Sequence, residues 1–275
     1  MGLIIGIDVG GSTTKIVGLN NGEIQSPMFI TAADPVTSLF GAFGKYIYDN
    51  GFSLGDIEQV MLTGVGSAYI EGDLYGLPTA KADEFQADGL GAHYGIGLKD
   101  LTVVSMGTGT SFVRITGDSI KHIGGISIGG GTLQGLASLL LKTHDFKTIC
   151  ELAKEGNIAN INLQIKDICA HDLEGLPMDA TASLFGKAKN SNPSDADIAL
   201  GLIYMVLQSI GASAILSALN TDIKDFVLIG NLTKVPQCAD IFPFLERVYN
   251  VKFHIPPYAE FRTAVGAALA YKPTK

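Results

Sequence analysis

The sequence predicts an α/β fold of two domains with a ligand-binding cleft between them. The prediction depends on three short apolar segments, each of which runs directly into glycine and small polar residues. These segments are residues 3–11, 101–111 and 226–231. Glycine lets the backbone approach a phosphate closely and point its N–H groups at the oxygens. Three strands that each bring a glycine to one end of a sheet therefore indicate a nucleotide that is bound from two sides.

The first glycine turn has the composition of a site for nucleotide phosphates and their metal ion. Asp8 ends the apolar strand, and a carboxylate there can hold Mg²⁺, usually through water molecules. Glycines, hydroxyl side chains and Lys15 follow, and they supply N–H donors, O–H donors and a positive charge. We expect nucleotide contacts from Asp8, Val9, Gly10, Gly11, Ser12, Thr13, Thr14 and Lys15. The spacing does not match a Walker A loop, and a plain hairpin with a polar tip stays an alternative.

Composition permits a large core and limits the possible partners. The chain has 275 residues, of which 47% are apolar and 17% charged, so it is long enough for two domains. Its net charge of −8 argues against nucleic acid as a partner. We expect no membrane-spanning helix and no secretion signal. Three widely spaced cysteines suit a reducing compartment and form no metal motif, so we expect a cytoplasmic protein.

Strands and helices alternate along the chain. Apolar spacing predicts a strand over residues 57–64 and helices over residues 35–50, 83–94, the second part of 124–141, 196–219 and 261–271. The first domain is expected to span residues 1–95 and the second residues 96–275. The nearly uncharged helix 196–219 predicts a homodimer, because so long an apolar helix is hard to cover without a partner. Burial of this helix inside the second domain is the alternative.

One acidic segment is a candidate for catalysis. Residues 81–88 read Lys-Ala-Asp-Glu-Phe-Gln-Ala-Asp at the expected start of a helix. Phosphoryl transfer to an alcohol needs a carboxylate that orients the hydroxyl and accepts its proton. Acidic residues also favour helix N-termini for electrostatic reasons alone. The residues by themselves do not choose between Asp83, Glu84 and Asp88.

A second conspicuous feature is the glycine run at residues 124–132. Three consecutive glycines before a helix offer free N–H donors at its positive end, which is a suitable place for an anion. Ser127, Thr132 and Gln134 would add side-chain donors. A hinge, or close packing of the helix on a sheet, is the alternative.

Together these motifs resemble one family. Asp-x-Gly-Gly-x-x-x-Lys at 8–15, Gly-Thr-Gly-Thr-Ser at 107–111 and Gly-Gly-Ile-Ser-Ile-Gly-Gly-Gly-Thr-Leu-Gln-Gly at 124–135 are similar to the type II pantothenate kinases. The resemblance covers nearly the whole chain, and the third motif is its most specific part. It implies two actin-like (ribonuclease H-like) α/β domains, ATP with Mg²⁺, a homodimer, and phosphorylation of pantothenate to 4'-phosphopantothenate, the first step of coenzyme A biosynthesis.

The resemblance also assigns residues. It favours Glu84 as the catalytic carboxylate, because Glu84 falls where the family keeps its catalytic Glu. Thr108 and Ser111 would lie near the pantothenate or the transferred phosphate. The remaining nucleotide contacts would come from Thr108, Gly129, Gly130, Gly131, Thr132, Leu133, Phe146 and Asn231.

One position departs from the family pattern. His122 stands where the family usually has an Arg that contacts pantothenate, so recognition of the acid end of the substrate is expected to differ. Lys121 or Arg114 would replace that cation, or His122 would contribute mainly when protonated. Two other enzyme classes share the predicted fold: kinases of another small alcohol such as an amino sugar, and dehydratase-activating ATPases with a cysteine-held iron–sulfur cluster. The separation of Cys150 and Cys169 does not look like that cluster motif.

Overall fold

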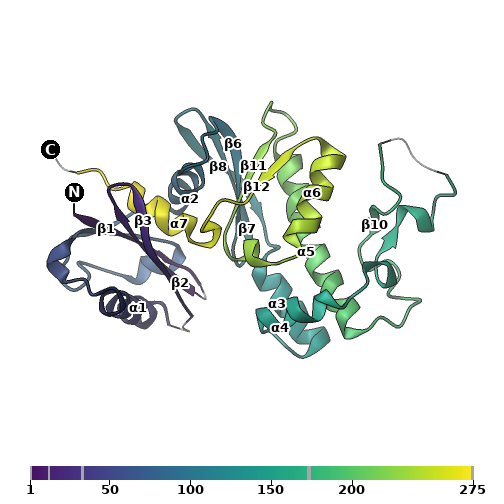
Figure 1. Ribbon diagram of the computed structural model, residues 1–275, viewed down its shortest axis with the longest axis horizontal. Coiled ribbons are helices and arrows are strands. Elements are labelled where there is room, and N and C mark those ends of the chain that lie inside the picture. Colours follow the sequence, from purple (N-terminus) through teal and green to yellow (C-terminus); the bar gives the residue numbers. More distant parts are fainter. Residues whose placement is uncertain (1, 12, 32–33, 172–174, 274–275) are drawn as a thin grey trace.

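The computed structural model describes residues 2–11, 13–31, 34–171 and 175–273. Two five-stranded sheets lie side by side with helices packed around them (Figure 1). The first sheet has the order β3-β2-β1-β4-β5. Its strands are β1 (Leu3–Val9), β2 (Thr13–Asn20), β3 (Glu23–Thr31), β4 (Ile57–Thr63) and β5 (Thr79–Lys81).

The second sheet repeats the connectivity of the first. Its order is β8-β7-β6-β11-β12. In both sheets three antiparallel strands are followed by two parallel ones. The strands are β6 (Asp100–Met106), β7 (Thr110–Thr116), β8 (Ser119–Ile126), β11 (Asp225–Ile229) and β12 (Lys252–His254). The predicted two-domain α/β fold is confirmed, and the two glycine turns occupy equivalent places in it.

Strand β1 is buried along its whole length because helices cover both faces of the first sheet. On one face lies α1 (Pro35–Asn50), which buries Leu39, Phe43 and Tyr46 against the sheet. This helix has the predicted bounds: the Asp34 carboxylate accepts the Thr37 N–H at 2.6 Å at its start, and Gly51 ends it with a φ of 66°.

The predicted long helix is α5 (Asp195–Ser217), which lies in the core of the second half. It is covered there by the second sheet and by α3 (Gly130–Leu141), α4 (Phe146–Lys154) and α6 (Cys238–Tyr249). By length and composition α5 qualifies as a membrane span, although no such helix was expected from the sequence. However, 56% of its apolar 18-residue stretch is buried inside the chain. Burial within the second domain, the alternative to a partner, therefore accounts for most of its apolar surface.

Two helices are exchanged between the halves. Helix α2 (Glu84–His93) follows the first sheet but packs on the second, whereas α7 (Arg262–Leu269) follows the second sheet but packs on β1 of the first (Figure 1). The two helices meet backbone to backbone. A Cβ at Gly91 would lie 1.7 Å from the Arg262 carbonyl oxygen, and one at Gly266 would lie 1.7 Å from that of Ala87. A residue with a side chain would therefore not fit at either position.

Arg262 fixes this crossing. Its guanidinium donates to the carbonyl oxygens of Gly91 at 3.1 Å, Tyr94 at 2.5 Å and Pro257 at 3.0 Å. It thus satisfies carbonyl groups at the C-terminus of α2, where a positive charge is also favourable. The predicted boundary between residues 95 and 96 separates the two sheets, and the independence of the two parts stays a prediction.

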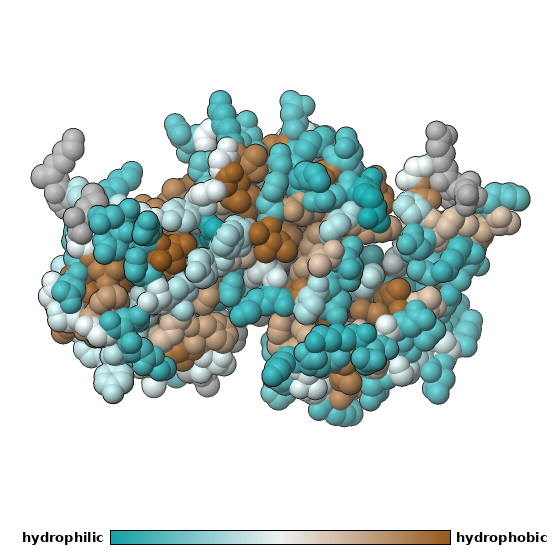
Figure 2. All heavy atoms as spheres, in the orientation of Figure 1, coloured by the Kyte–Doolittle hydropathy of each residue, from teal (hydrophilic) through white to brown (hydrophobic). Residues whose placement is uncertain are grey.

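Residues between α4 and α5 form a separate projection, to the right in Figure 1. It contains the two-stranded sheet of β9 (Leu163–Gln164) and β10 (Thr181–Ser183) and short helical turns. Figure 2 shows the surface hollowed elsewhere, between the lobe of the first sheet and the end of the molecule that carries α3 and α4.

Candidate functional site

Asp8 and Lys15 form a buried pair at the end of β1. They are cross-strand neighbours in the β1–β2 hairpin, and the Lys15 Nζ lies 3.3 Å from the Asp8 Oδ2. Gly64, which follows β4, has a φ of 83°, and a Cβ there would lie 2.5 Å from the Asp8 Oδ1. Only glycine therefore fits beside this carboxylate, and the end of the sheet is shaped around it.

The surroundings of Asp8 fit an ion that is held mainly by phosphates and water. Thr63 lies opposite Asp8 in the β1–β4 register, and its hydroxyl is buried with no hydrogen-bond partner among the described residues. In the described part of the chain, no group of three His, Cys, Asp or Glu side chains could hold a metal ion by itself. This donor set suits Mg²⁺, which keeps several waters and binds through one or two carboxylates together with substrate phosphates.

The rest of the first turn is only partly available to a ligand. Gly10 donates its N–H to the Thr13 carbonyl at 2.9 Å, which closes the turn, and Gly11 is exposed. The Thr14 hydroxyl lies 2.8 Å from the Ser38 hydroxyl, so it ties β2 to α1. Val9 is fully buried and presents backbone alone. Ser12 lies outside the described residues.

The second glycine turn and the glycine run form one unit. Gly130 and Gly131 donate their N–H groups to the carbonyl oxygens of Gly107 at 2.8 Å and Thr108 at 2.9 Å. The expectation of free donors is therefore wrong for these two N–H groups, because the turn itself takes them. A Cβ at Gly129 would lie 2.5 Å from the Thr108 carbonyl oxygen, which is the close packing that had been the alternative.

Other predicted nucleotide contacts surround this unit. Asn231 follows Gly230, whose φ of 94° and close approach to Met106 bring the end of β11 against the end of β6. Thr132 is half-buried, and its hydroxyl donates to the Ser127 carbonyl. Phe146 is half-buried at the start of α4, whereas the Leu133 side chain belongs to the core. Their contacts with a nucleotide stay predictions.

The structure distinguishes the three acids that the sequence left open. The Asp83 carboxylate caps α2 by accepting the Gln86 N–H at 3.0 Å. The Asp88 carboxylate is buried and accepts the Thr263 hydroxyl at 2.6 Å. Glu84 is half-buried, and among the described residues its carboxylate has no hydrogen-bond partner. Of the three, Glu84 is therefore the one whose carboxylate is free to meet a ligand.

Glu84 shares its electrostatic environment with Asp8 and Lys15. Burial raises the pKa of the Glu84 carboxyl above its ordinary value, and the negative charges of Asp8 and Asp83 raise the pKa further. Lys15 acts in the opposite direction. The geometry agrees with this coupling: Ala82, two residues before Glu84, donates its N–H to the Leu62 carbonyl at 2.8 Å, and the next residue of β4, Thr63, lies opposite Asp8. The start of α2 and the end of β1 are therefore at the same end of the first sheet.

His122 lies beside the start of α2. Its exposed ring stacks on Phe85 with ring centroids 3.8 Å apart and planes 11° from parallel. The Gln86 side chain donates to the Ile120 carbonyl at 3.1 Å, so β8 is attached to the first turn of the helix. This stack is not predictable from the sequence, because Phe85 has the pattern of one more apolar residue of a helix.

Neither cation suggested as a substitute lies on that face of the sheet. Val113 and Ile115 pack against α2, so the alternating Arg114 faces the other way, and its guanidinium donates to the Ser217 carbonyl at 2.7 Å. Lys121 is opposite Arg114 in the β7–β8 register and shares its face. Ser111 alternates with Val113 and lies on the α2 face, and Thr108 is exposed in the turn.

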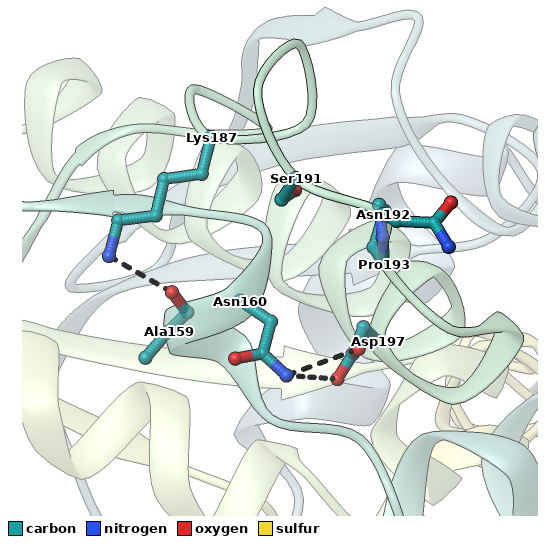
Figure 3. Close-up of a pocket in the computed structure, with 7 residues that line it drawn as sticks. All are labelled: Ala159, Asn160, Lys187, Ser191, Asn192, Pro193 and Asp197. Carbon is teal, nitrogen blue, oxygen red and sulfur yellow. Dashed lines mark hydrogen bonds between the residues drawn. The ribbon is translucent and has the colours of Figure 1, made fainter.

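A cavity lies apart from these residues, in the projection between α4 and α5. It is lined by Ala159, Asn160, Lys187, Ser191, Asn192, Pro193 and Asp197 (Figure 3). Its charged groups are paired internally. The Lys187 ammonium lies 2.7 Å from the Asp167 carboxylate, and Asp197 accepts hydrogen bonds from Asn157, Asn160 and Ser194. These contacts stabilise the projection. None of the residues that line the cavity is a predicted site residue.

Solved structures of the same architecture include nucleotide-bound enzymes. The activator of the 2-hydroxyisocaproyl-CoA dehydratase from Clostridium difficile, with bound ADPNP, has a TM-score of 0.69 at 16% identity and covers 97% of this chain and 93% of its own. A ROK family glucokinase from Streptomyces griseus, in complex with glucose and AMPPNP, has a TM-score of 0.63 at 14% identity, with 97% and 98% covered. The fold is thus that of the actin-like ATPases and ROK kinases.

Sequence comparison identifies the family. A model of the Fumble family matches residues 100–244. The type II pantothenate kinase of Bacillus cereus is 27% identical over 235 residues, which are 82% of this chain and 83% of that protein. The 4'-phosphopantetheine phosphatase of Mus musculus is 40% identical over 121 residues, which are 42% of this chain and 15% of that protein. The chain belongs to the Fumble family, the family of the type II pantothenate kinases, as its motifs predicted.

Proposed function

We propose that the protein is a cytoplasmic ATP-dependent kinase that phosphorylates the primary alcohol of pantothenate, giving 4'-phosphopantothenate. The observation that carries the proposal is the position of Glu84. Helix α2 begins at the end of the first sheet that carries Asp8 and Lys15, so this half-buried carboxylate lies on the side of their glycine turn. A carboxylate, a cation and a metal-binding acid are the groups that phosphoryl transfer to an alcohol requires.

The proposed roles follow from the chemistry of each group. Glu84 orients the substrate hydroxyl and accepts its proton while the alcohol oxygen forms a bond to the γ-phosphorus of ATP and the bond to the β-phosphate oxygen breaks. A raised pKa makes Glu84 a better proton acceptor than an ordinary carboxylate near neutral pH. Lys15 neutralises phosphate charge, and Asp8 would hold Mg²⁺, which supplies charge neutralisation on the phosphates.

Another small alcohol stays an alternative substrate, because the α2 face of the sheet presents His122 and neither Arg114 nor Lys121. The dehydratase-activator class is supported by fold alone, at 16% and 19% identity. Cys150 and Cys238 are buried in the core, and Cys169 is partly covered. Among the described residues, the chain therefore has no pair of surface thiols that could bind an iron–sulfur cluster. The deciding experiment is ATP consumption with pantothenate, pantetheine and N-acetylglucosamine side by side. The proposal expects the highest kcat/KM with pantothenate, and turnover of the sugar alone would reject it.

The residue at position 122 should set the affinity for pantothenate. Arginine carries a permanent charge, pairs with a carboxylate through two N–H groups and also stacks on aromatic rings, whereas histidine offers one donor. His122→Arg should therefore lower the KM for pantothenate, and it should preserve the stack on Phe85. An unchanged or higher KM would mean that this position does not meet the acid end of the substrate.

We also propose a homodimer. The apolar surface that α5 leaves open lies at its C-terminal end, where Leu216 and Leu219 are 64% and 66% exposed. Leu139 and Leu140 at the end of α3 are exposed as well. Light scattering at micromolar concentration should give twice the chain mass, and Leu216→Glu combined with Leu219→Glu should reduce it. A monomeric mass for the unmodified protein would exclude the dimer.

A further inference from the structure

The proposed mechanism leaves one buried acid without a role. Asp88 is 1% exposed, and it follows Glu84 by four residues on α2. Residues four apart in a helix lie on the same face, one turn from each other. Asp88 therefore lies directly behind the proposed catalytic carboxylate, on the side of the helix that faces away from solvent.

Asp88 connects α2 to α7 where the two halves of the molecule cross. Its Oδ1 accepts the Thr263 hydroxyl at 2.6 Å, and both groups are buried. Its Oδ2 is buried and makes no hydrogen bond of good geometry with the described residues, although the Ser105 hydroxyl of β6 lies close enough to the carboxyl to affect its pKa. On either side of this contact the helices touch through backbone, at Gly266 against Ala87 and at Gly91 against Arg262. A polar side chain that is only half satisfied in such a place is costly, so it calls for an explanation.

The groups that face Asp88 come from several elements. Glu84 on α2 and Asp8 on β1 are acidic, and Lys15 on β2 is paired with Asp8. Thr263 on α7 and Ser105 on β6 present hydroxyls. Arg262, next to Thr263, turns its guanidinium to the carbonyl groups at the end of α2. Burial raises the pKa of Asp88 to about 7, the hydroxyls of Thr263 and Ser105 lower it, and Glu84 and Asp8 raise it further.

We propose that Asp88 is a positioning residue for phosphoryl transfer: it holds the first turns of α2, and with them Glu84, against α7 at the crossing of the two halves. This inference rests on the proposed function. In its neutral form, Asp88 keeps the hydrogen bond to Thr263 without placing a second negative charge one turn from Glu84. Like charges four residues apart destabilise a helix, and here burial strengthens the effect.

Kinetics of three variants test the role. In the unmodified protein we expect kcat to decline above pH 7, because Asp88 then becomes charged one turn from Glu84. Asp88→Asn is neutral at every pH and keeps an oxygen for Thr263. It should therefore keep kcat within about threefold below pH 7 and should not show the decline above pH 7. Asp88→Ala should lower kcat by about 10-fold to 100-fold, as a small misplacement of a reacting group does. Thr263→Val removes the same hydrogen bond from α7 and should lower kcat in the same direction. The KM for ATP should change little in all three.

A second readout needs no substrate. A carboxyl whose pKa is higher in the folded than in the unfolded protein makes the folded state less stable as pH rises between the two values, here from about 4 to about 7. The Tm of Asp88→Asn relative to the unmodified protein should therefore increase over this range. Parallel Tm curves would show that Asp88 is charged throughout and would overturn the proposal.

The outcomes separate this inference from the proposed function. If the unmodified protein phosphorylates none of the alcohols, the proposed function fails, whatever the Tm curves show. If it turns over and Asp88→Ala keeps both kcat and the pH profile, Asp88 is not a positioning residue. If Asp88→Ala loses ATP binding together with turnover, the substitution disrupts more than the position of Glu84, and the proposal also fails.

Discussion

Replacing Glu84 with glutamine should lower kcat by about 100-fold or more, the usual contribution of a general base. Glutamine keeps the size of the side chain and its place at the start of α2, but it accepts no proton at neutral pH. The affinity for ATP should change little, because Glu84 faces the acceptor alcohol in the proposed mechanism. The measurement is steady-state turnover with pantothenate together with ATP binding by calorimetry.

Asp83→Asn is the matched control. Asp83 caps the same helix, and asparagine is as good an N-cap as aspartate, so both stability and kcat should stay close to those of the unmodified protein. A Glu84→Gln variant with near-normal kcat would exclude Glu84 as the base. A variant that fails to bind ATP would place Glu84 at the nucleotide instead.

Asp8→Asn should remove most turnover and raise the concentration of Mg²⁺ that the reaction requires. The amide cannot hold Mg²⁺ as a carboxylate does, and Lys15 loses its charged partner. Breaking a buried ion pair also costs stability, about 3 to 5 kcal/mol. Turnover should therefore be measured well below the Tm of the variant, as a titration with Mg²⁺.

Asp34→Asn serves as the control for that change. It also converts an acid to an amide in the first half of the chain, but Asp34 is an exposed cap of α1, so turnover and Mg²⁺ dependence should stay unchanged. An Asp8→Asn variant that turns over normally at the usual Mg²⁺ concentration would show that Asp8 does not hold the metal.

Local signals predicted most elements correctly. Helix α1 carries its own start and stop in Asp34-Pro35 and Gly51, and its bounds were predicted to the residue. The strands that end in glycine were also found, because a β-branched run followed by glycine is a local pattern. The shared connectivity of the two sheets was implied only by the family resemblance, since pairing between strands is set by contacts far apart in the chain.

The choice among Asp83, Glu84 and Asp88 shows where sequence reasoning ends. All three acids lie within one and a half turns of the same helix, and their spacing does not distinguish them. What separates them is a cap, a free carboxylate and a buried contact with Thr263, which is 175 residues away. The fold also brings together the rings of His122 and Phe85, which are 37 residues apart in the chain. It likewise brings the N–H groups of Gly130 and Gly131 to the carbonyl groups of the second glycine turn.

The most direct test of the proposed function is to identify the product. The protein should be incubated with ATP, Mg²⁺ and pantothenate, and the mixture followed by ³¹P NMR and mass spectrometry, with Glu84→Gln in parallel. We predict that 4'-phosphopantothenate and ADP form in equal amounts with the unmodified protein and about 100-fold more slowly with the variant. Release of phosphate with no phosphorylated pantothenate, or no consumption of ATP, would contradict the proposal.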